Sequence, residues 1–412
     1  MQNFTEYPSI DNSAWIHLAV HNKWHSNLFR LEVQLKSAVC PAKLQQAVDA
    51  VAARFPMLAA GIRKEKQTFV VVPNPGRLYI RVDRKPLAYM PKEEWQDCAT
   101  RVLYEQRRIA VEIFHSLTDG AGGLQFLKAL LAEYFDVPAE PVEEKAAWED
   151  SYKRYAAGKP SSLPGGTSYL LPAAAPESRA VHSTTWTFAA DALREKARAE
   201  HTTVTAWLTA LFAQTVMKFQ QAEAAPGKAL FPVRIMVPVD LRRRFPSASL
   251  RNFSLYALPQ LLPQAADAPF SEIVERMAEQ LQAQNAYSRL RTAITTNVAL
   301  EQKTAALPLW MKCVALRSGF EWCGGRSSCI TLSNLGPVTF PDGVQQEVEQ
   351  FRFLLTPRAH SPYNCGVVST GGTLTLTLTC RGPEQGVEKA LQAAFRAQGL
   401  VPECEGDITE KV

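Results

Sequence analysis

The chain has 412 residues, of which 46% are hydrophobic and 21% charged, and its formal net charge is +5. This composition lies near the average for globular proteins and excludes wholesale disorder and a fibrous architecture. The 45 basic residues are spread along the sequence instead of forming a dense block, so nucleic acid is not an expected partner.

The sequence carries no signal for export or membrane insertion. Residues 1–11 contain neither the basic nor the apolar segment of a secretory signal. No stretch approaches the roughly 18 to 20 apolar residues that span a bilayer. Eight cysteines in 412 residues are too sparse for a disulfide framework, which is typical of a reducing compartment. We therefore expect a cytoplasmic protein without a transmembrane segment.

Strands and helices alternate in the first part of the chain. Apolar residues at every second position predict a strand that begins near Leu28 and has one face in water. The strand over 109–113 runs directly into residues 114 and 115. The other patterns predict a helix over 41–55, a hairpin over 59–73, a short strand over 78–82, and helices over 92–104 and 122–135.

The segment 158–179 is rich in proline and glycine, which is typical of a surface connection, and we place a linker there. An N-terminal subdomain over 1–157 and a C-terminal subdomain over 180–412 follow from this boundary. The second unit has predicted strands at 182–188 and 231–237, near 330 and 351, and at 374–380, and predicted helices at 203–219, within 271–300, and at 386–398. Each part mixes strands and helices, so the expected fold class is α/β, with two mixed β-sheets each flanked by helices.

The segment HSLTDG at residues 115–120 is the strongest candidate for chemistry. It places His115 at the carboxyl end of a strand, four residues before an Asp-Gly turn. A neutral imidazole with a fixed backbone can accept a proton near physiological pH. For an arbitrary H-x-x-x-D-G segment, a histidine that only caps a turn is the simpler interpretation.

The context favours the catalytic interpretation. An H-x-x-x-D-G motif at a strand end, in a chain of this length, resembles the coenzyme-A-dependent acyltransferase superfamily, which includes chloramphenicol acetyltransferase and the condensation domains of peptide synthetases. Other segments resemble motifs of that superfamily in the expected order: ARFPML at 53–58, VPVDLR at 237–242 with RNF at 251–253, and SNLGP at 333–337. Phe114 replaces the first histidine of condensation domains, and the D-F-G-W-G signature of plant enzymes is absent. The sequence is therefore most similar to the alcohol acetyltransferase-like branch.

The resemblance implies a fold and a role for each motif residue. It implies two chloramphenicol-acetyltransferase-like subdomains with a channel between them. His115 would be the general base that removes a proton from the acceptor. Asp119 would pair with an arginine, for which Arg54 occupies the matching position, and Gly120 would permit a close backbone turn.

Two further sets of residues are candidates for binding. The oxyanion of a tetrahedral intermediate needs preorganised donors, and Ser333 and Asn334 are our candidates. A polar turn before Gly336 explains the same residues equally well. Arg242 and Arg243 could contact the phosphates of coenzyme A, although a solvated loop is the alternative interpretation.

We predict no metal site. Three histidines at positions 17, 21 and 25 have helical spacing, which would place three imidazoles on one helix face. No carboxylate or cysteine joins them, and the aromatic residues around them favour an ordinary, partly buried segment.

The sequence thus predicts an acyltransferase that moves an acyl group, most simply acetyl, from a CoA thioester to a small alcohol or amine. Acyl-CoA would be a co-substrate, and no permanently bound cofactor is expected. One alternative is a condensation-type transferase that takes its donor from an acyl carrier protein, and another is a non-catalytic binding protein of the same fold. Two similar subdomains in one chain make a monomer sufficient. The acceptor and the acyl chain length stay open.

Overall fold

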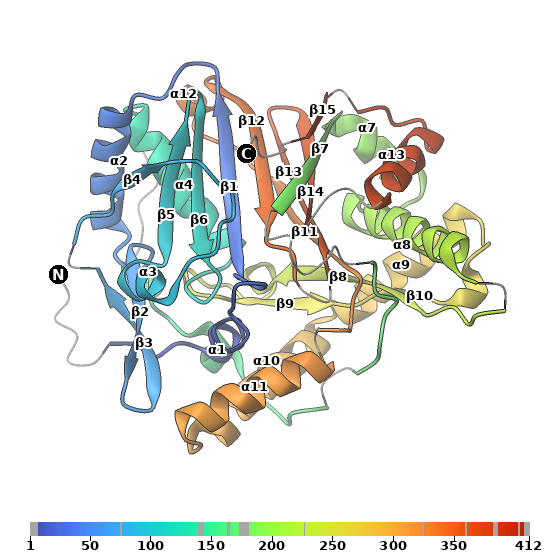
Figure 1. The fold of residues 1–412 in the computed structure, drawn as a ribbon, viewed down its shortest axis with the longest axis horizontal. Helices are drawn as coiled ribbons and strands as arrows, with labels where there is room; N and C mark the ends of the chain where they lie inside the picture. Colours follow the sequence, from blue (N-terminus) through green and yellow to red (C-terminus); the bar gives the residue numbers. More distant parts are fainter. Residues whose placement is uncertain are drawn as a thin grey trace.

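The computed structural model describes residues 7–74, 76–138, 144–162, 165–172, 181–225, 227–323, 325–358, 361–381, 386–402 and 404–407. Two large sheets stand side by side, each with helices packed against it (Figure 1). The predicted α/β class with two mixed sheets is confirmed. No helix within the described ranges combines the length and the apolarity that a membrane crossing requires.

The N-terminal sheet has five strands. Its order is β12 (Val348–Leu355), β1 (Leu28–Leu35), β6 (Arg108–Phe114), β5 (Thr100–Glu105) and β4 (Ile80–Val82). The helices α2 (Pro41–Arg54) and α4 (Gly120–Tyr134) pack against each other and against this sheet through apolar stripes. Smaller elements complete the unit: α1 (Asn12–Ala19), α3 (Lys92–Asp97), and a separate hairpin of β2 (Ala60–Glu65) and β3 (Thr68–Pro73).

The predicted water-exposed face of β1 is wrong, because its polar side chains are buried. Arg30 and Glu32 are buried and lie opposite Glu112 and Arg352 on the neighbouring strands. The Arg30 guanidinium donates to Glu32 at 2.7 Å and to Glu112 at 2.9 Å, and it also contacts Asp83. Charged groups can be buried when each is paired in this way, so an alternating pattern did not distinguish paired charges from solvated ones.

The predicted helix over 92–104 is also wrong beyond Asp97. The segment divides into α3 and the strand β5, which lies between β4 and β6. Thr100 and Val102 face the interior, while Arg101 reaches Glu112 and joins the buried ionic face. Pairing on both edges of β5 outweighs the local helical spacing, which is the usual way that tertiary contacts override propensity.

The C-terminal sheet has eight strands. Seven form the order β10 (Gln260–Leu261), β8 (Val233–Asp240), β11 (Ile330–Pro337), β13 (Tyr363–Thr370), β14 (Thr373–Arg381), β7 (Val181–Ala189) and β15 (Cys404–Asp407), and β9 (Ser254–Ala257) pairs with β8. The strand β13 was not predicted from the sequence. The helices that cover this sheet on the right of Figure 1 are α7 (Ala190–Ala199), α8 (Val204–Glu223), α9 (Phe270–Gln284) and α13 (Val387–Ala397).

Two long helices form the lower edge of the molecule in Figure 1. These are α10 (Tyr287–Ala305) and α11 (Leu309–Cys323), which contact α1 and the short helix α6 (Ser151–Tyr155). Further short elements are α5 (Glu144–Ala147), α12 (Asp342–Gln345), and the 3-10 turns η1 (Leu241–Arg243) and η2 (Pro263–Ala265).

The strand β12 joins the two units. It belongs to the C-terminal part of the chain, yet it pairs antiparallel with β1 from Phe29 opposite Leu355 to Leu35 opposite Val348. Figure 1 shows this strand at the edge of the N-terminal sheet, next to β13 and β14 of the C-terminal sheet. The linker expected over 158–179 lies partly outside the described residues, so the division at that segment stays a prediction.

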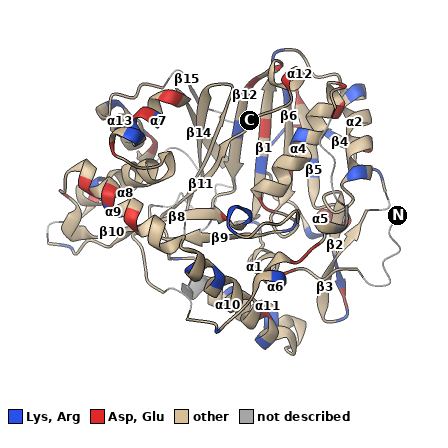
Figure 2. Cartoon of the chain, turned by 180° about the vertical axis from the view of Figure 1, so that it is seen from behind, with Lys and Arg blue, Asp and Glu red and all other residues tan. Residues whose placement is uncertain are grey.

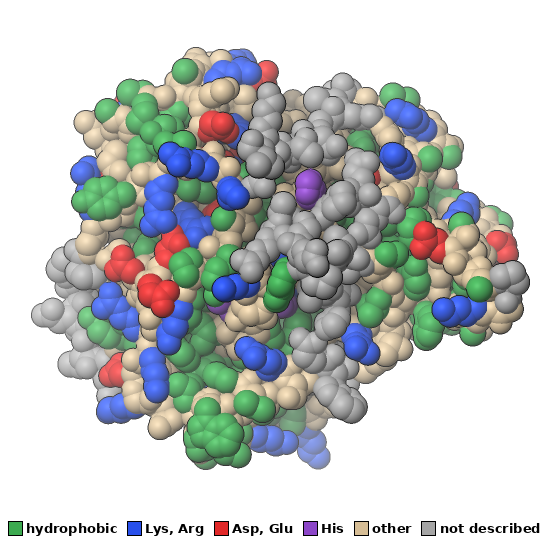
Figure 3. Space-filling model, in the orientation of Figure 1, with side chains coloured by type: hydrophobic (Ala, Val, Ile, Leu, Met, Phe, Trp, Pro, Cys, Tyr) green, Lys and Arg blue, Asp and Glu red, His purple; other side chains and the backbone are tan. Residues whose placement is uncertain are grey.

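Charged side chains are mixed on the surface. On the face drawn in Figure 3, basic, acidic and apolar side chains alternate over short distances. From behind, Figure 2 shows a basic turn beside β8 and β9, where the chain leaves β8 for η1. The arginines of this turn line a cavity.

Candidate active site

The motif segment forms the connection between β6 and α4. Its backbone is fixed at the start, where the His115 N–H donates to the carbonyl of Asn27 at 2.9 Å and the Leu117 N–H donates to the carbonyl of Phe114 at 2.8 Å. Further along, the Ser116 hydroxyl donates to the carbonyl of Ala14 at 3.0 Å. A local turn and hydrogen bonds to two other segments therefore hold the loop that carries the imidazole.

The ring of His115 is oriented by Asn252, which lies between β8 and β9. The amide nitrogen of Asn252 donates to the backbone carbonyl of His115 at 2.8 Å, and this contact fixes the orientation of the amide. The amide oxygen then lies 3.0 Å from Nδ1 of His115. Because that oxygen only accepts, we assign the ring proton to Nδ1, which leaves the lone pair on Nε2.

A second histidine stacks on the first. The ring of His17, from α1, lies 4.2 Å from the ring of His115 with an angle of 11° between the planes. Burial lowers the pKa of His115 from its ordinary value of 6.5, although Asp119 and Asn252 oppose the shift. Burial and the neighbouring His115 together hold the pKa of His17 well below 6.5. His115 is therefore neutral and able to accept a proton at physiological pH.

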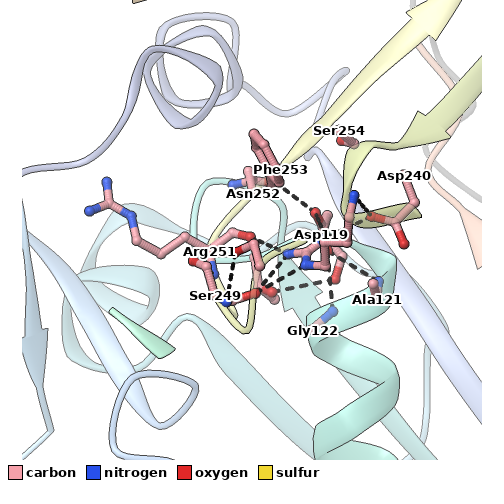
Figure 4. A network of polar contacts seen from close by, with 12 residues as sticks. Asp119, Ala121, Gly122, Asp240, Ser249, Arg251, Asn252, Phe253 and Ser254 are labelled. Atoms are coloured by element: carbon pink, nitrogen blue, oxygen red, sulfur yellow. Dashed lines mark hydrogen bonds and ion pairs between the residues drawn. The ribbon is translucent and has the colours of Figure 1, made fainter. Parts of the chain in front are cut away.

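Asp119 begins α4 and connects it to the C-terminal part of the chain. Its Oδ1 accepts from the N–H groups of Ala121 and Gly122, which is an N-cap arrangement. Its Oδ2 accepts from Nη1 of Arg242 and from the N–H of Phe253, both at 2.8 Å. Figure 4 shows Asp119 between Phe253 and the start of α4 at Ala121 and Gly122. Although burial opposes it, the charge of Arg242 lowers the pKa of Asp119 below its ordinary value.

Arg54 is not the partner of Asp119, so that expectation is corrected. Arg54 ends α2 and donates to Glu133 at 2.7 Å. Glu133 lies fourteen residues after Asp119 along α4, and at a rise of 1.5 Å per residue this is about 20 Å away. Arg242 fills the role instead, so the pairing expected for Asp119 exists, with an arginine from the opposite part of the chain.

The glycines of the motif permit close packing at the start of α4. A Cβ added to Gly120 would lie 2.9 Å from the side chain of Leu335, on β11. A Cβ added to Gly122 would lie 2.1 Å from Oγ1 of Thr118 and 2.7 Å from the carbonyl oxygen of Leu250. Both glycines thus lie where the two parts of the chain approach each other.

His115 lines a cavity of about 1440 Å³. Residues of both sheets contribute to its walls, among them His17 and Phe29 from the N-terminal part and Ser333 from β11. The His115 ring is partly exposed to this cavity and is not sealed in a core. The side chain that can accept a proton is therefore accessible to a ligand.

The two oxyanion candidates differ in the structure. Asn334 uses its amide nitrogen to donate to Thr205 at 3.0 Å and its amide oxygen to accept from the N–H of Gly336 at 2.8 Å. It therefore stabilises the turn at Gly336, which has a φ of 79°. Ser333 also lines the cavity, and its hydroxyl makes no hydrogen bond to the described residues, so it is the better candidate donor.

The basic candidates also differ. Arg242 is fully engaged, because it donates to Asp119, Asp240, and the carbonyls of Ser249 and Arg251, and it is therefore unsuitable for a phosphate. Arg243 is exposed and lines the cavity. No group of metal-binding side chains occurs within the described ranges. The helix α1 ends at Ala19, so His21 and His25 do not share a helix face with His17.

Three residues at this site were not assigned a role from the sequence. Asn252 was noted only within the RNF segment, and its position beside that motif was the available signal. His17 was considered only as a metal ligand. Arg358, which lines the same cavity, follows the exchanged strand β12, and no motif marked it.

The fold of this chain, two helix-flanked sheets with a cavity lined by residues of both, is similar to that of several solved structures. TRI101 from F. sporotrichioides, solved with coenzyme A and T-2, is similar with a TM-score of 0.67 and 14% identity over 97% of this chain and 99% of that chain. Polyketide synthase associated protein 5 from Mycobacterium tuberculosis gives a TM-score of 0.60 and 16% identity, over 94% of this chain and 97% of that one.

The nonribosomal peptide synthetase FmoA3 contains the same architecture within a longer chain. Its TM-score is 0.62 at 16% identity, and the similarity covers 97% of this chain and 45% of the synthetase chain. No protein-family model and no curated protein matches the sequence. At these identities the similarity to solved structures defines the fold.

Proposed function

We propose that this protein is an acyltransferase that moves an acyl group from a CoA thioester to the hydroxyl or amine of a small acceptor. The observation that carries the proposal is the held imidazole: Asn252 occupies Nδ1 of His115, so the basic lone pair belongs to Nε2, on a ring that lines a large cavity. A general base needs this combination of orientation, neutrality and access.

The residues support a direct transfer. Nε2 of His115 takes the proton from the acceptor O–H or N–H, and the freed electron pair attacks the thioester carbonyl. The Ser333 hydroxyl donates to the oxyanion of the tetrahedral intermediate. The C–S bond then breaks, and the proton held by His115 passes to the departing thiolate, so no covalent acyl-enzyme forms.

The cavity suits two substrates of which one is anionic. At about 1440 Å³ it exceeds the roughly 300 to 1,000 Å³ of ordinary ligand pockets, which leaves space for a donor and an acceptor together. Five Lys and Arg side chains line it against two carboxylates, and both of these carboxylates pair with Arg242. The exposed Arg243 and Arg244 are our candidates for the phosphates of coenzyme A.

The test is release of free thiol from acetyl-CoA with a panel of small alcohols and amines. His115→Ala should lower turnover about 100-fold to 10,000-fold, which is the usual contribution of a general base. His182→Ala is the matched control, because His182 lies on β7 away from the cavity. Equal loss in both variants, or full turnover in His115→Ala, would exclude the mechanism. Thiol release only from an acyl carrier protein would instead identify a condensation-type donor.

A further inference from the structure

Arg358 is a cationic side chain in the cavity that has no anionic partner within the described residues. It follows β12 and donates to the hydroxyl of Thr331 at 2.8 Å, and its guanidinium also lies 3.6 Å from the sulfur of Met236. No described carboxylate lies within 4.0 Å of it. Burial lowers the pKa of Arg358 to about 10.

Two other arginines with little exposed surface show how such a charge is usually paired. Arg30 contacts three carboxylates, and Arg242 contacts Asp119 and Asp240. A buried charge without a counter-ion destabilises the fold, so proteins normally pair it. The environment of Arg358 supplies a hydroxyl and a thioether and leaves the positive charge uncompensated on a surface that a ligand can reach.

Arg358 lies close to the candidate base. Thr356, two residues earlier, exchanges hydrogen bonds with the backbone of Leu28, which pairs in register with Phe114. The charge of Arg358 is also among the influences that lower the pKa of His17, whose ring stacks on His115. The guanidinium therefore lies within electrostatic reach of the two stacked imidazoles.

The contact to Thr331 also places Arg358 relative to the oxyanion candidate. Thr331 and Ser333 are two residues apart on β11, and both line the cavity. Alternate residues of a strand share a face and lie about 7 Å apart. A substrate that spans about this length can therefore place one end at Ser333 and its other end at the guanidinium.

A second buried polar group lines the same region. The side chain of Asn364, on β13, is 3% exposed and lines the cavity. Its amide nitrogen donates to the carbonyl of Thr356 at 2.7 Å, while its amide oxygen accepts no hydrogen bond. The wall of the cavity near β12 thus carries two polar groups, Asn364 and Arg358, whose needs the described residues do not fully meet.

We propose that Arg358 binds a carboxylate carried by one of the two substrates. A carboxylate matches the fork geometry of a guanidinium, and its single negative charge neutralises the single positive charge of a desolvated site. A dianionic phosphate would leave excess charge there and is better served by the exposed Arg243 and Arg244. The substrate class is then a hydroxy or amino acid acceptor, or a dicarboxylic acyl group. The proposal rests on the proposed function only for the identity of the substrate, because the carboxylate site can be measured without turnover.

The binding test compares 6-hydroxyhexanoate with its neutral amide, 6-hydroxyhexanamide, by calorimetry. The wild type should bind the carboxylate at least about tenfold more tightly than the amide, which corresponds to 1.4 kcal/mol. Arg358→Met should abolish this preference, and Arg358→Lys should retain part of it. Arg234→Met is the matched control, because Arg234 on β8 also donates only to neutral groups and lies off the cavity. No preference in the wild type, or an unchanged preference in Arg358→Met, overturns the proposal.

A second assay identifies which substrate carries the carboxylate. Turnover is compared for the two acceptors with acetyl-CoA, and for succinyl-CoA against butyryl-CoA with hexanol. Arg358→Met should lose the preference for the charged member in only one of these pairs. Absence of all turnover with intact carboxylate binding would sink the transferase proposal and leave the Arg358 site standing. Because Arg358→Met removes an uncompensated charge, its urea midpoint should not fall below that of the wild type.

Discussion

Replacing Asp119 with asparagine should destabilise the protein far more than removal of an exposed ion pair. The side chains of Asp119 and Arg242 are 6% and 11% exposed, and their charged atoms lie 2.8 Å apart. Removal of one member of a buried pair typically costs about 3–5 kcal/mol, because the remaining charge has lost its partner. Asparagine keeps an oxygen for the N–H groups of Ala121 and Gly122, so the helix cap is preserved.

The free energy of unfolding of Asp119→Ala should be lower than that of Asp119→Asn by a further ~1 kcal/mol, because alanine also removes the N-cap. In the double variant with Arg242→Met, the loss should be smaller than the sum of the single losses by about 0.5–3 kcal/mol. Although burial opposes it, Arg242 lowers the folded pKa of Asp119 below 3.8, so this stabilisation is present above pH 3.8. It is lost as the pH falls below 3.8 toward the folded pKa.

The assay is urea unfolding followed by tryptophan fluorescence and far-UV circular dichroism. Asp191→Asn is the control, because Asp191 forms an exposed pair with Arg194 in which the side chains are 81% and 43% exposed. That substitution should change the free energy of unfolding by less than about 1 kcal/mol. If Asp119→Asn costs no more than Asp191→Asn, then the ion pair does not hold α4 to the C-terminal part of the chain.

Three further outcomes are expected. Because burial lowers the pKa of His115, the acid limb of the pH profile for kcat/KM should have its midpoint below 6.5, and a midpoint above 6.5 would contradict the assignment. Asn252→Ala should lower kcat about 5- to 150-fold through loss of the buried hydrogen bond to the ring, and an unchanged kcat in the folded variant would contradict the orienting role; stability should fall as well, because the buried amide also bonds the His115 carbonyl. Gly122→Ala should destabilise the protein by about 1–3 kcal/mol, because the added Cβ would meet the Leu250 carbonyl. Gly319→Ala is the control and should stabilise it by up to ~1 kcal/mol, because a Cβ there would meet nothing within 4 Å. Urea unfolding measures both changes.

The sequence predicted the elements that carry a clear period and missed those set by distant partners. The strand into His115 and the helix after Asp119 follow from apolar spacing and an N-cap residue, both of which are local. The strand β5 was missed because its identity depends on pairing with β4 and β6. The buried face of β1 was missed because charged residues such as Arg30 and Glu32 are typical of a face in water. Only their pairing with charges on neighbouring strands allows them to be buried.

The same distinction applies to the site. His115 could be found because a motif marks it and a strand end exposes it. The arginine that pairs with Asp119 could not be found, because Arg242 is about 120 residues away in the sequence. The resemblance to known motifs indicated Arg54 instead. Asn334 was grouped with Ser333 by adjacency, and both line the cavity, yet the amide of Asn334 is already bonded to Thr205 and to the N–H of Gly336.

The groups that orient His115 come mostly from the other sheet. Asn252 holds its ring, while Arg242 and the Phe253 N–H hold Asp119, and all three lie in the connection between β8 and β9. Ser333 lies on β11, and Arg358 follows β12, the strand that the C-terminal part contributes to the N-terminal sheet. The N-terminal part therefore provides the imidazole and the C-terminal part provides its orientation. Two contacts fix the position of one part relative to the other: the pairing of β12 with β1, and the buried ion pair of Asp119 with Arg242. Both are therefore needed for the chemistry as well as for stability.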